Sequence, residues 1–132
     1  MIRWLEKNKS ISIIFLVMMA IEIFLISSIS GGEITKGPDF SWLYHFSVFF
    51  LFNFFFLTSI KSNKTITGKK LVLVLAISLI YSILDEIHQF FVPLRNPSIK
   101  DILIDNIGIF SSAIIYLYYS KNERSLSKKI TQ

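Results

Sequence analysis

The chain has 132 residues, of which 52% are hydrophobic and 17% are charged, and its formal net charge is +5. Soluble domains carry about 25% charged residues, so this composition argues against a water-soluble protein and favours a single domain in a lipid bilayer. The basic residues flank apolar runs, where they suit lipid headgroups, so nucleic acid is not expected as a partner. Because cysteine is absent, disulfides, thiolate metal sites and cysteine nucleophiles are excluded.

Four apolar segments follow one another along the chain, at about residues 11–29, 42–60, 71–92 and 99–119. Each has the roughly 20 residues that a helix needs to cross ~30 Å of hydrocarbon. The linkers contain every Gly and Pro except Gly108. We therefore predict an all-α integral membrane protein in which residues 1–120 form a bundle of four transmembrane helices. Residues 121–132 are predicted to form a polar cytoplasmic tail, and disorder is expected only there.

The first segment has a second interpretation, because a signal peptide also begins with a basic stretch and an apolar run. Ser28 and Ser30 are small residues spaced like a cleavage site. However, the run is too long for a usual signal peptide, and Glu22 interrupts it. We expect a retained helix.

The distribution of Lys and Arg predicts the orientation in the membrane. Eleven of these residues lie in the N-terminal stretch, the second linker and the C-terminal tail. Only Lys36, Arg95 and Lys100 lie in the first and third linkers. Because short cytoplasmic loops carry an excess of Lys and Arg, both termini are predicted to be cytoplasmic and the third linker external. The predicted location is the cell membrane, with multiple passes.

Polar residues are concentrated at the predicted outer end. His45 opens the second segment. At about 100° per residue, a polar stripe on the third segment contains Ser78, Ser82, Asp85, Glu86 and Gln89. A second stripe, on the fourth segment, contains Asp101, Asp105, Gly108 and Ser112. We expect the two stripes to face each other. Isolated ionisable groups in a membrane cost from ~2.5 to more than 10 kcal/mol, so such a group marks a functional site or a paired one.

This arrangement resembles the VanZ-like family, small membrane proteins named after a teicoplanin-resistance protein of gram-positive bacteria. The family pattern is E-x-x-Q at the end of one helix, then an Arg, then D-x-x-x-[ND]-x-x-G opening the next helix. The matching residues are Glu86, Gln89, Arg95, Asp101, Asp105 and Gly108, accompanied by Asp85, His88 and His45. Many members have Asp-Lys just before the histidine of the second helix. This chain has Ser41-Trp42 there, and its nearest acid is Asp39. The resemblance implies a gram-positive envelope and a link to glycopeptide resistance, without a settled reaction.

The crowded carboxylates leave three chemical interpretations open. They cannot all stay ionised without compensation, so they share protons, bind a divalent cation, or surround a cationic group of a ligand. Oxygen ligands favour Mg²⁺, Ca²⁺ or Mn²⁺. A purely structural interpretation pairs Arg95 with Glu86 or Asp101 and bonds a protonated Glu22 to Asn53, while His88 is an interfacial residue.

Two functional hypotheses follow. In the first, the protein binds a lipid-linked cell-wall precursor, a lipid headgroup or a glycopeptide, and Arg95 contacts a phosphate or carboxylate. In the second, it is an intramembrane enzyme acting on a lipid-linked phosphate, with Glu86 or Asp101 as base or metal ligand, His45 as acid and Arg95 as clamp. The candidate ligand-binding residues are His45, Asp85, Glu86, Gln89, Arg95, Asp101 and Asp105. The sequence assigns no catalytic residue, no cofactor and no set of metal ligands. The lipid bilayer is one expected partner. A four-helix unit this small often needs self-association or another partner, which leaves a homo-oligomer open.

Overall fold

The computed structural model describes residues 2–30, 40–60 and 66–130, with side chains described as far as Asn122. All regular structure in these ranges is helical. The elements are α1 (Ile2–Lys7), α2 (Lys9–Ser27), α4 (Ser41–Ile60), α5 (Gly68–Phe90) and α6 (Ile99–Ile130). Lys36 and Asp39 of the first linker and residues 61–65 of the second lie outside the described residues.

Four of these helices are long and apolar enough to cross a membrane: Lys9–Ser27, Ser41–Ile60, Gly68–Phe90 and Ile99–Asn122. Their bounds lie within three residues of the predicted segments, so the prediction of four apolar helices is confirmed. Large apolar side chains remain exposed on these helices, for example Val72 (65%) and Ile114 (67%). Extensive apolar surface of this kind is unfavourable in water and suits contact with lipid chains.

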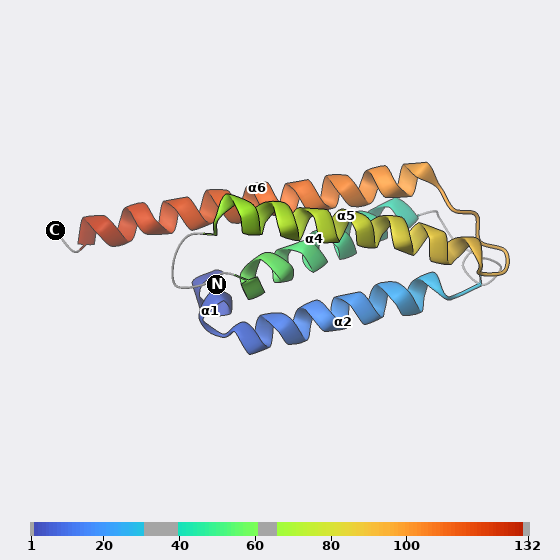
Figure 1. Ribbon diagram of the computed structural model, residues 1–132, viewed down its shortest axis with the longest axis horizontal. Helices are drawn as coiled ribbons and strands as arrows, with labels where there is room; N and C mark the ends of the chain where they lie inside the picture. The colour runs from blue at the N-terminus through green and yellow to red at the C-terminus, as the bar shows by residue number, and fades with distance from the viewer. Residues whose placement is uncertain (1, 31–39, 61–65, 131–132) are drawn as a thin grey trace.

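The four long helices run side by side, and α4 contacts α2, α5 and α6 (Figure 1). The approach of α4 to α6 is close at Gly108, where a Cβ atom would lie 2.5 Å from the carbonyl oxygen of Phe46. The small residue of the α6 stripe therefore meets α4 and not α5. The two polar stripes do face each other at Asp105, one turn before Gly108 in α6, where the Ser82 hydroxyl of α5 donates to the Asp105 carboxylate.

Two helical stretches differ from the sequence-based expectation. The short helix α1 was not predicted, and it buries Ile2 and Leu5 in a core cluster with residues of α4, α5 and α6. The expectation of disorder after Ser120 is wrong for residues 121–130, because α6 continues without a break to Ile130. In Figure 1, α1 and the C-terminal part of α6 lie at the same end of the molecule.

A buried polar group about midway along the helices joins α4, α5 and α6. Asn53 donates to the carbonyl oxygen of Ile109 (3.0 Å) and to the hydroxyl of Ser112 (2.6 Å), and it accepts a bond from Ser78 (2.9 Å). No described hydrogen bond joins Glu22 to this group, so the expected bond between Glu22 and Asn53 is wrong. Glu22 instead lies half-buried at a shallow groove between turns of α2.

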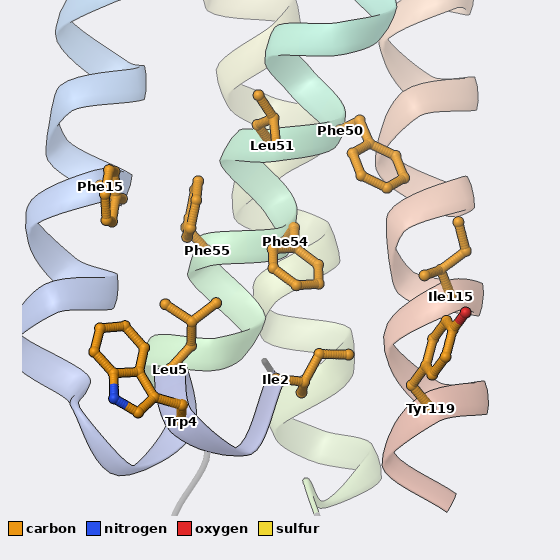
Figure 2. A pocket seen from close by; sticks show the side chains of 10 residues that line it. All are labelled: Ile2, Trp4, Leu5, Phe15, Phe50, Leu51, Phe54, Phe55, Ile115 and Tyr119. Carbon is orange, nitrogen blue, oxygen red and sulfur yellow. The ribbon is translucent and has the colours of Figure 1, made fainter. Parts of the chain in front are cut away.

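A larger groove of about 710 Å³ opens near α1, between α2, α4 and α6 (Figure 2). Its lining residues are Ile2, Trp4, Leu5, Phe15, Phe50, Leu51, Phe54, Phe55, Ile115 and Tyr119. Figure 2 shows Phe15 of α2 and Phe55 of α4 on facing sides. These two rings stack, and their centroids are 4.9 Å apart. The lining carries no charged side chain, so the groove suits hydrocarbon and not a polar headgroup.

Candidate functional site

The candidate site lies where α2 and α5 end and where α4 and α6 begin, which we call the polar end. His45 stands in the second turn of α4, Asp105 in the second turn of α6, and Asp85 to Gln89 in the last turns of α5. Because α5 runs opposite to α4 and α6, these positions come to the same height along the helices. Side chains more than 40 residues apart in sequence therefore meet.

The centre of the site is a buried pair formed by His45 and Asp105. Nδ1 of His45 lies 3.0 Å from Oδ1 of Asp105, and the hydroxyl of Ser82 donates to Oδ2 of Asp105 at 2.9 Å. His45 is 4% exposed and Asp105 is fully buried. An ionised Asp105 accepts the bond from Nδ1–H, which orients the ring and leaves Nε2 as the basic nitrogen. Among the described residues, Nε2 makes no hydrogen bond.

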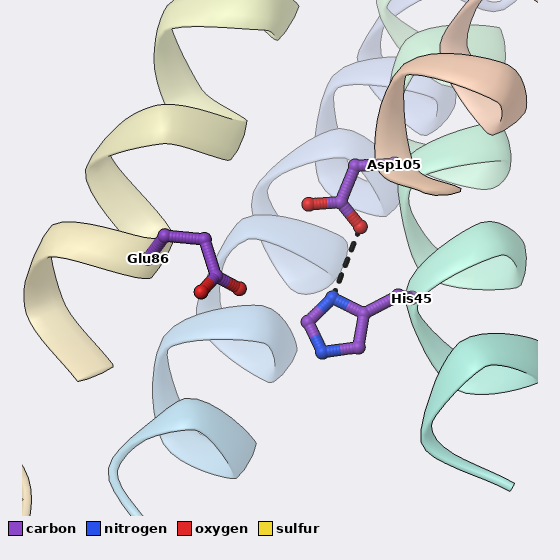
Figure 3. Close-up of side chains that lie close together, drawn as sticks. All are labelled: His45, Glu86 and Asp105. Atoms are coloured by element: carbon purple, nitrogen blue, oxygen red, sulfur yellow. Dashed lines mark hydrogen bonds and ion pairs between the residues drawn. The ribbon is translucent and has the colours of Figure 1, made fainter. Parts of the chain in front are cut away.

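Glu86 completes a set of three residues that we call the triad: His45, Glu86 and Asp105. One potential ligand atom from each of these residues lies within 4.8 Å of the other two, and all three residues are buried. Figure 3 shows the Glu86 carboxylate extending from α5 toward the imidazole, while Asp105 reaches the ring from α6. Three helices thus contribute one titratable side chain each.

Two further contacts fix the Glu86 carboxylate. Its Oε2 accepts a bond from the backbone N–H of Ser98 at 2.7 Å, just before α6 begins. Gln89 donates through Nε2 to Oε1 of Glu86 (3.4 Å) and to Oδ2 of Asp85 (3.0 Å). The Ser98 hydroxyl accepts from the backbone N–H of Lys100, as an N-cap does. A carboxylate at a helix N-terminus is also favoured by the helix dipole.

The surroundings of the triad are strongly acidic. Asp85 is buried beside Glu86, and Asp101 in the first turn of α6 interacts electrostatically with both His45 and Glu86. Six of the seven candidate ligand-binding residues are therefore brought together: His45, Asp85, Glu86, Gln89, Asp101 and Asp105.

Arg95 is the exception. Its Nε donates to the carbonyl oxygen of Ile29 (3.2 Å) and its Nη2 to that of Ile26 (2.9 Å), so it binds the C-terminal end of α2. The expected pairing of Arg95 with Glu86 or Asp101 is wrong. The preceding residue, Leu94, has a φ of 60°, and this left-handed turn places Arg95 on the α2 side.

Two aromatic residues at the polar end differ in how well the sequence reveals them. His88 lies outside the triad, where its Nε2 is 3.0 Å from the Ser28 hydroxyl and its ring packs on Phe24. This agrees with its interpretation as an interfacial residue. Tyr44 was missed, although its buried hydroxyl has no hydrogen-bond partner within residues 2–30, 40–60 and 66–122 and lies within electrostatic reach of Asp85 and Arg95. Its position beside His45 was a possible signal, hidden by the many aromatic residues of α4.

The geometry supports three kinds of chemistry. The carboxylates and imidazole can accept hydrogen bonds from a polar headgroup. The Asp105-oriented imidazole can take up a proton at Nε2. Finally, the triad has the donor atoms of a metal site.

A model of the VanZ/LLP1 family matches residues 28–120, a range that includes α4, α5, most of the span in α6 and every residue of the triad. No curated protein and no solved structure gives a significant match. Together with the four helices of membrane-spanning length, the family match indicates a multi-pass membrane protein.

Proposed function

The chain belongs to the VanZ/LLP1 family, as its motifs predicted, and on this premise we propose that it is a cell-envelope protein that binds the headgroup of a lipid-linked cell-wall precursor. The observation that carries the proposal is the convergence of His45, Glu86 and Asp105 at one end of an otherwise apolar set of helices. Such buried polar groups are costly in a membrane and are retained where they serve a ligand.

The proposed topology is a four-helix bundle in the cell membrane of a gram-positive bacterium, with both termini in the cytoplasm. The excess of Lys and Arg at the termini and in the second linker supports this orientation. The polar end then lies at the outer leaflet, where an exported precursor and an external antibiotic are both present.

The chemistry of the site suits a ligand rich in hydrogen-bond donors. An ionised carboxylate accepts hydrogen bonds and donates none. A precursor headgroup offers the matching hydroxyl, amide and amine donors. Arg95 stands near the site with Nη1 unpartnered among the described residues, and it is available to an anionic group at the rim. Binding would mask the target of teicoplanin and contribute to resistance.

The proposal is tested with purified protein in lipid nanodiscs. We expect saturable binding of a lipid-linked precursor, weakened at least about 5-fold in His45→Gln, because loss of a buried hydrogen-bond partner costs about 1–3 kcal/mol. His88→Gln is the matched control and should bind as the wild type does. Absence of saturable binding would contradict the proposal, and equal or tighter binding of teicoplanin or a plain phospholipid would reassign the ligand.

One observation favours catalysis as a second candidate function. The imidazole of His45 is oriented by a buried carboxylate, and its Nε2 has no partner in the part of the chain that the structure describes. This is the arrangement of a general base, and Glu86 lies beside it. The substrate would be a lipid-linked phosphate. Release of a labelled product from this substrate by wild type, and its loss in His45→Gln, would support the enzyme. Stable binding of the substrate without release of a product would favour the binding protein over the enzyme.

A further inference from the structure

We propose that His45, Glu86 and Asp105 bind one divalent metal ion, Zn²⁺ or Mn²⁺. This inference deepens the proposed function and rests on it for its biological meaning, because the ion would be the contact to a phosphate of the lipid-linked headgroup. The binding of the ion itself can be tested without any lipid ligand.

The geometry of the triad is close to that of a metal site. Ligands at 2.0–2.2 Å from one ion lie about 3 Å apart at 90° and about 3.5 Å apart at the tetrahedral angle, so a triad spread over at most 4.8 Å would close onto an ion with side-chain shifts of roughly 1 Å. The separation of 3.0 Å between Nδ1 of His45 and Oδ1 of Asp105 is that of two neighbouring ligands at about 90°.

The charge at the polar end provides a separate reason. Asp85, Glu86 and Asp105 are 6%, 4% and 0% exposed. In the described part of the chain, His45 is the only cationic side chain that contacts any of them, since Arg95 binds backbone carbonyls of α2. Buried charges are normally paired or coordinate metals. One divalent ion would compensate the carboxylates that His45 leaves unpaired.

The imidazole is placed to exchange a proton for the ion. His45 is 4% exposed, and its Nδ1 lies 3.0 Å from Oδ1 of Asp105. An ion on Nδ1 would replace the proton shared by His45 and Asp105, so that both residues become ligands together with Glu86. Ser82 and Ser98 would keep the two carboxylates in place.

The donor set selects the ion. Mg²⁺ and Ca²⁺ prefer oxygen ligands alone, whereas imidazole favours transition metals and zinc. One nitrogen and two carboxylates therefore suit Zn²⁺ or Mn²⁺. With three protein ligands, one or more coordination positions remain open for a phosphate oxygen or water.

The experiment uses full-length protein in nanodiscs, freed of metal by a chelator and dialysed against Zn²⁺ or Mn²⁺. We expect one ion per chain in the wild type and binding weakened about 100-fold or more in His45→Gln and Glu86→Gln. His88→Gln and Glu22→Gln, which change the same residue types outside the triad, should bind as the wild type does. No stoichiometric ion in the wild type, or equal binding by all variants, would overturn the proposal.

A second measurement does not depend on any variant folding. In ¹⁵N-histidine-labelled wild type, Zn²⁺ should shift the ring nitrogens of His45 and leave those of His88 unchanged. A shift at His88 alone, or at neither histidine, would overturn the proposal. Precursor binding by metal-free protein would refute the link to the ligand while leaving the proposed function intact. Ion binding without precursor binding would refute the proposed function and leave the metal site intact.

Discussion

At the scale of single residues, Arg95 shows how a cation near several acids can be used for another purpose. The last carbonyl groups of a helix have no partner within the helix, and they carry the negative end of its dipole. Arg95 donates to the carbonyl oxygen of Ile26 in the last turn of α2 and to that of Ile29 just beyond it. The residue therefore ties the α5–α6 turn to α2 and indirectly supports the acidic site.

This role gives a prediction for stability. Arg95→Ala should lower the free energy of unfolding by about 1–3 kcal/mol, because two charge-assisted hydrogen bonds are lost. Arg95→Lys should recover part of this loss, since a lysine keeps the charge but does not reproduce the fork of donors. Denaturant titration in detergent micelles measures both variants. Equal stability of the wild type and Arg95→Ala would show that the α2 contact is not structural.

The site residues could be predicted to different degrees. Asp85, Glu86 and Gln89 share one face of α5 because helical periodicity depends only on spacing in the sequence. The partner of Arg95 could not be predicted in this way, because it depends on the left-handed turn at Leu94. Glu22 was wrongly paired with Asn53, since spacing within α2 says nothing about which residue of α4 lies opposite.

At the scale of helices, the bounds of the spans were predictable because length and hydropathy determine them. Which faces pack together was less predictable. Gly108 belongs to the stripe that was expected to face α5, but its close approach is toward α4, where backbone meets backbone. The continuation of α6 beyond Ser120 was missed, because the polar composition there suggested disorder, although residues 121–132 contain no Gly or Pro.

The close approach at Gly108 predicts an asymmetry between two glycines. Gly108→Ala should destabilise the protein by about 1–3 kcal/mol, because the added methyl group forces α4 and α6 apart. Gly68→Ala is the matched control, since a Cβ there meets nothing within 4 Å. Thermal unfolding in nanodiscs would compare them. A wild-type melting temperature for Gly108→Ala would contradict the described approach.

The buried polar group around Asn53 gives another prediction at this scale. Asn53→Leu should cost about 1–3 kcal/mol, because the buried Ser78 hydroxyl loses its acceptor and the bonds from Asn53 to Ser112 and to the Ile109 carbonyl are lost. Ser111→Ala, which removes a neighbouring hydroxyl without a described side-chain hydrogen bond, should change stability little. Denaturant titration would measure both. Equal effects of the two changes would show that the Asn53 bonds do not hold the helices together.

At the scale of the whole molecule, the polar end and the α1 groove lie at opposite ends of the helices, and the first is acidic while the second is apolar. The proposed topology assigns them to the outer and inner leaflets. Because the chain has no cysteine, single cysteines can report this directly. In intact cells, an impermeant maleimide should label Asn96→Cys and should label Lys69→Cys only after permeabilisation. The reverse pattern would place the polar end in the cytoplasm.

The most direct test of the account is teicoplanin susceptibility in a sensitive gram-positive host. We expect the wild type and His88→Gln to raise the minimum inhibitory concentration. Glu86→Gln should accumulate to the same level in the membrane and give no protection, because it loses one carboxylate of the triad and keeps the shape of the side chain. Equal protection by Glu86→Gln and the wild type would contradict a functional role for the polar end.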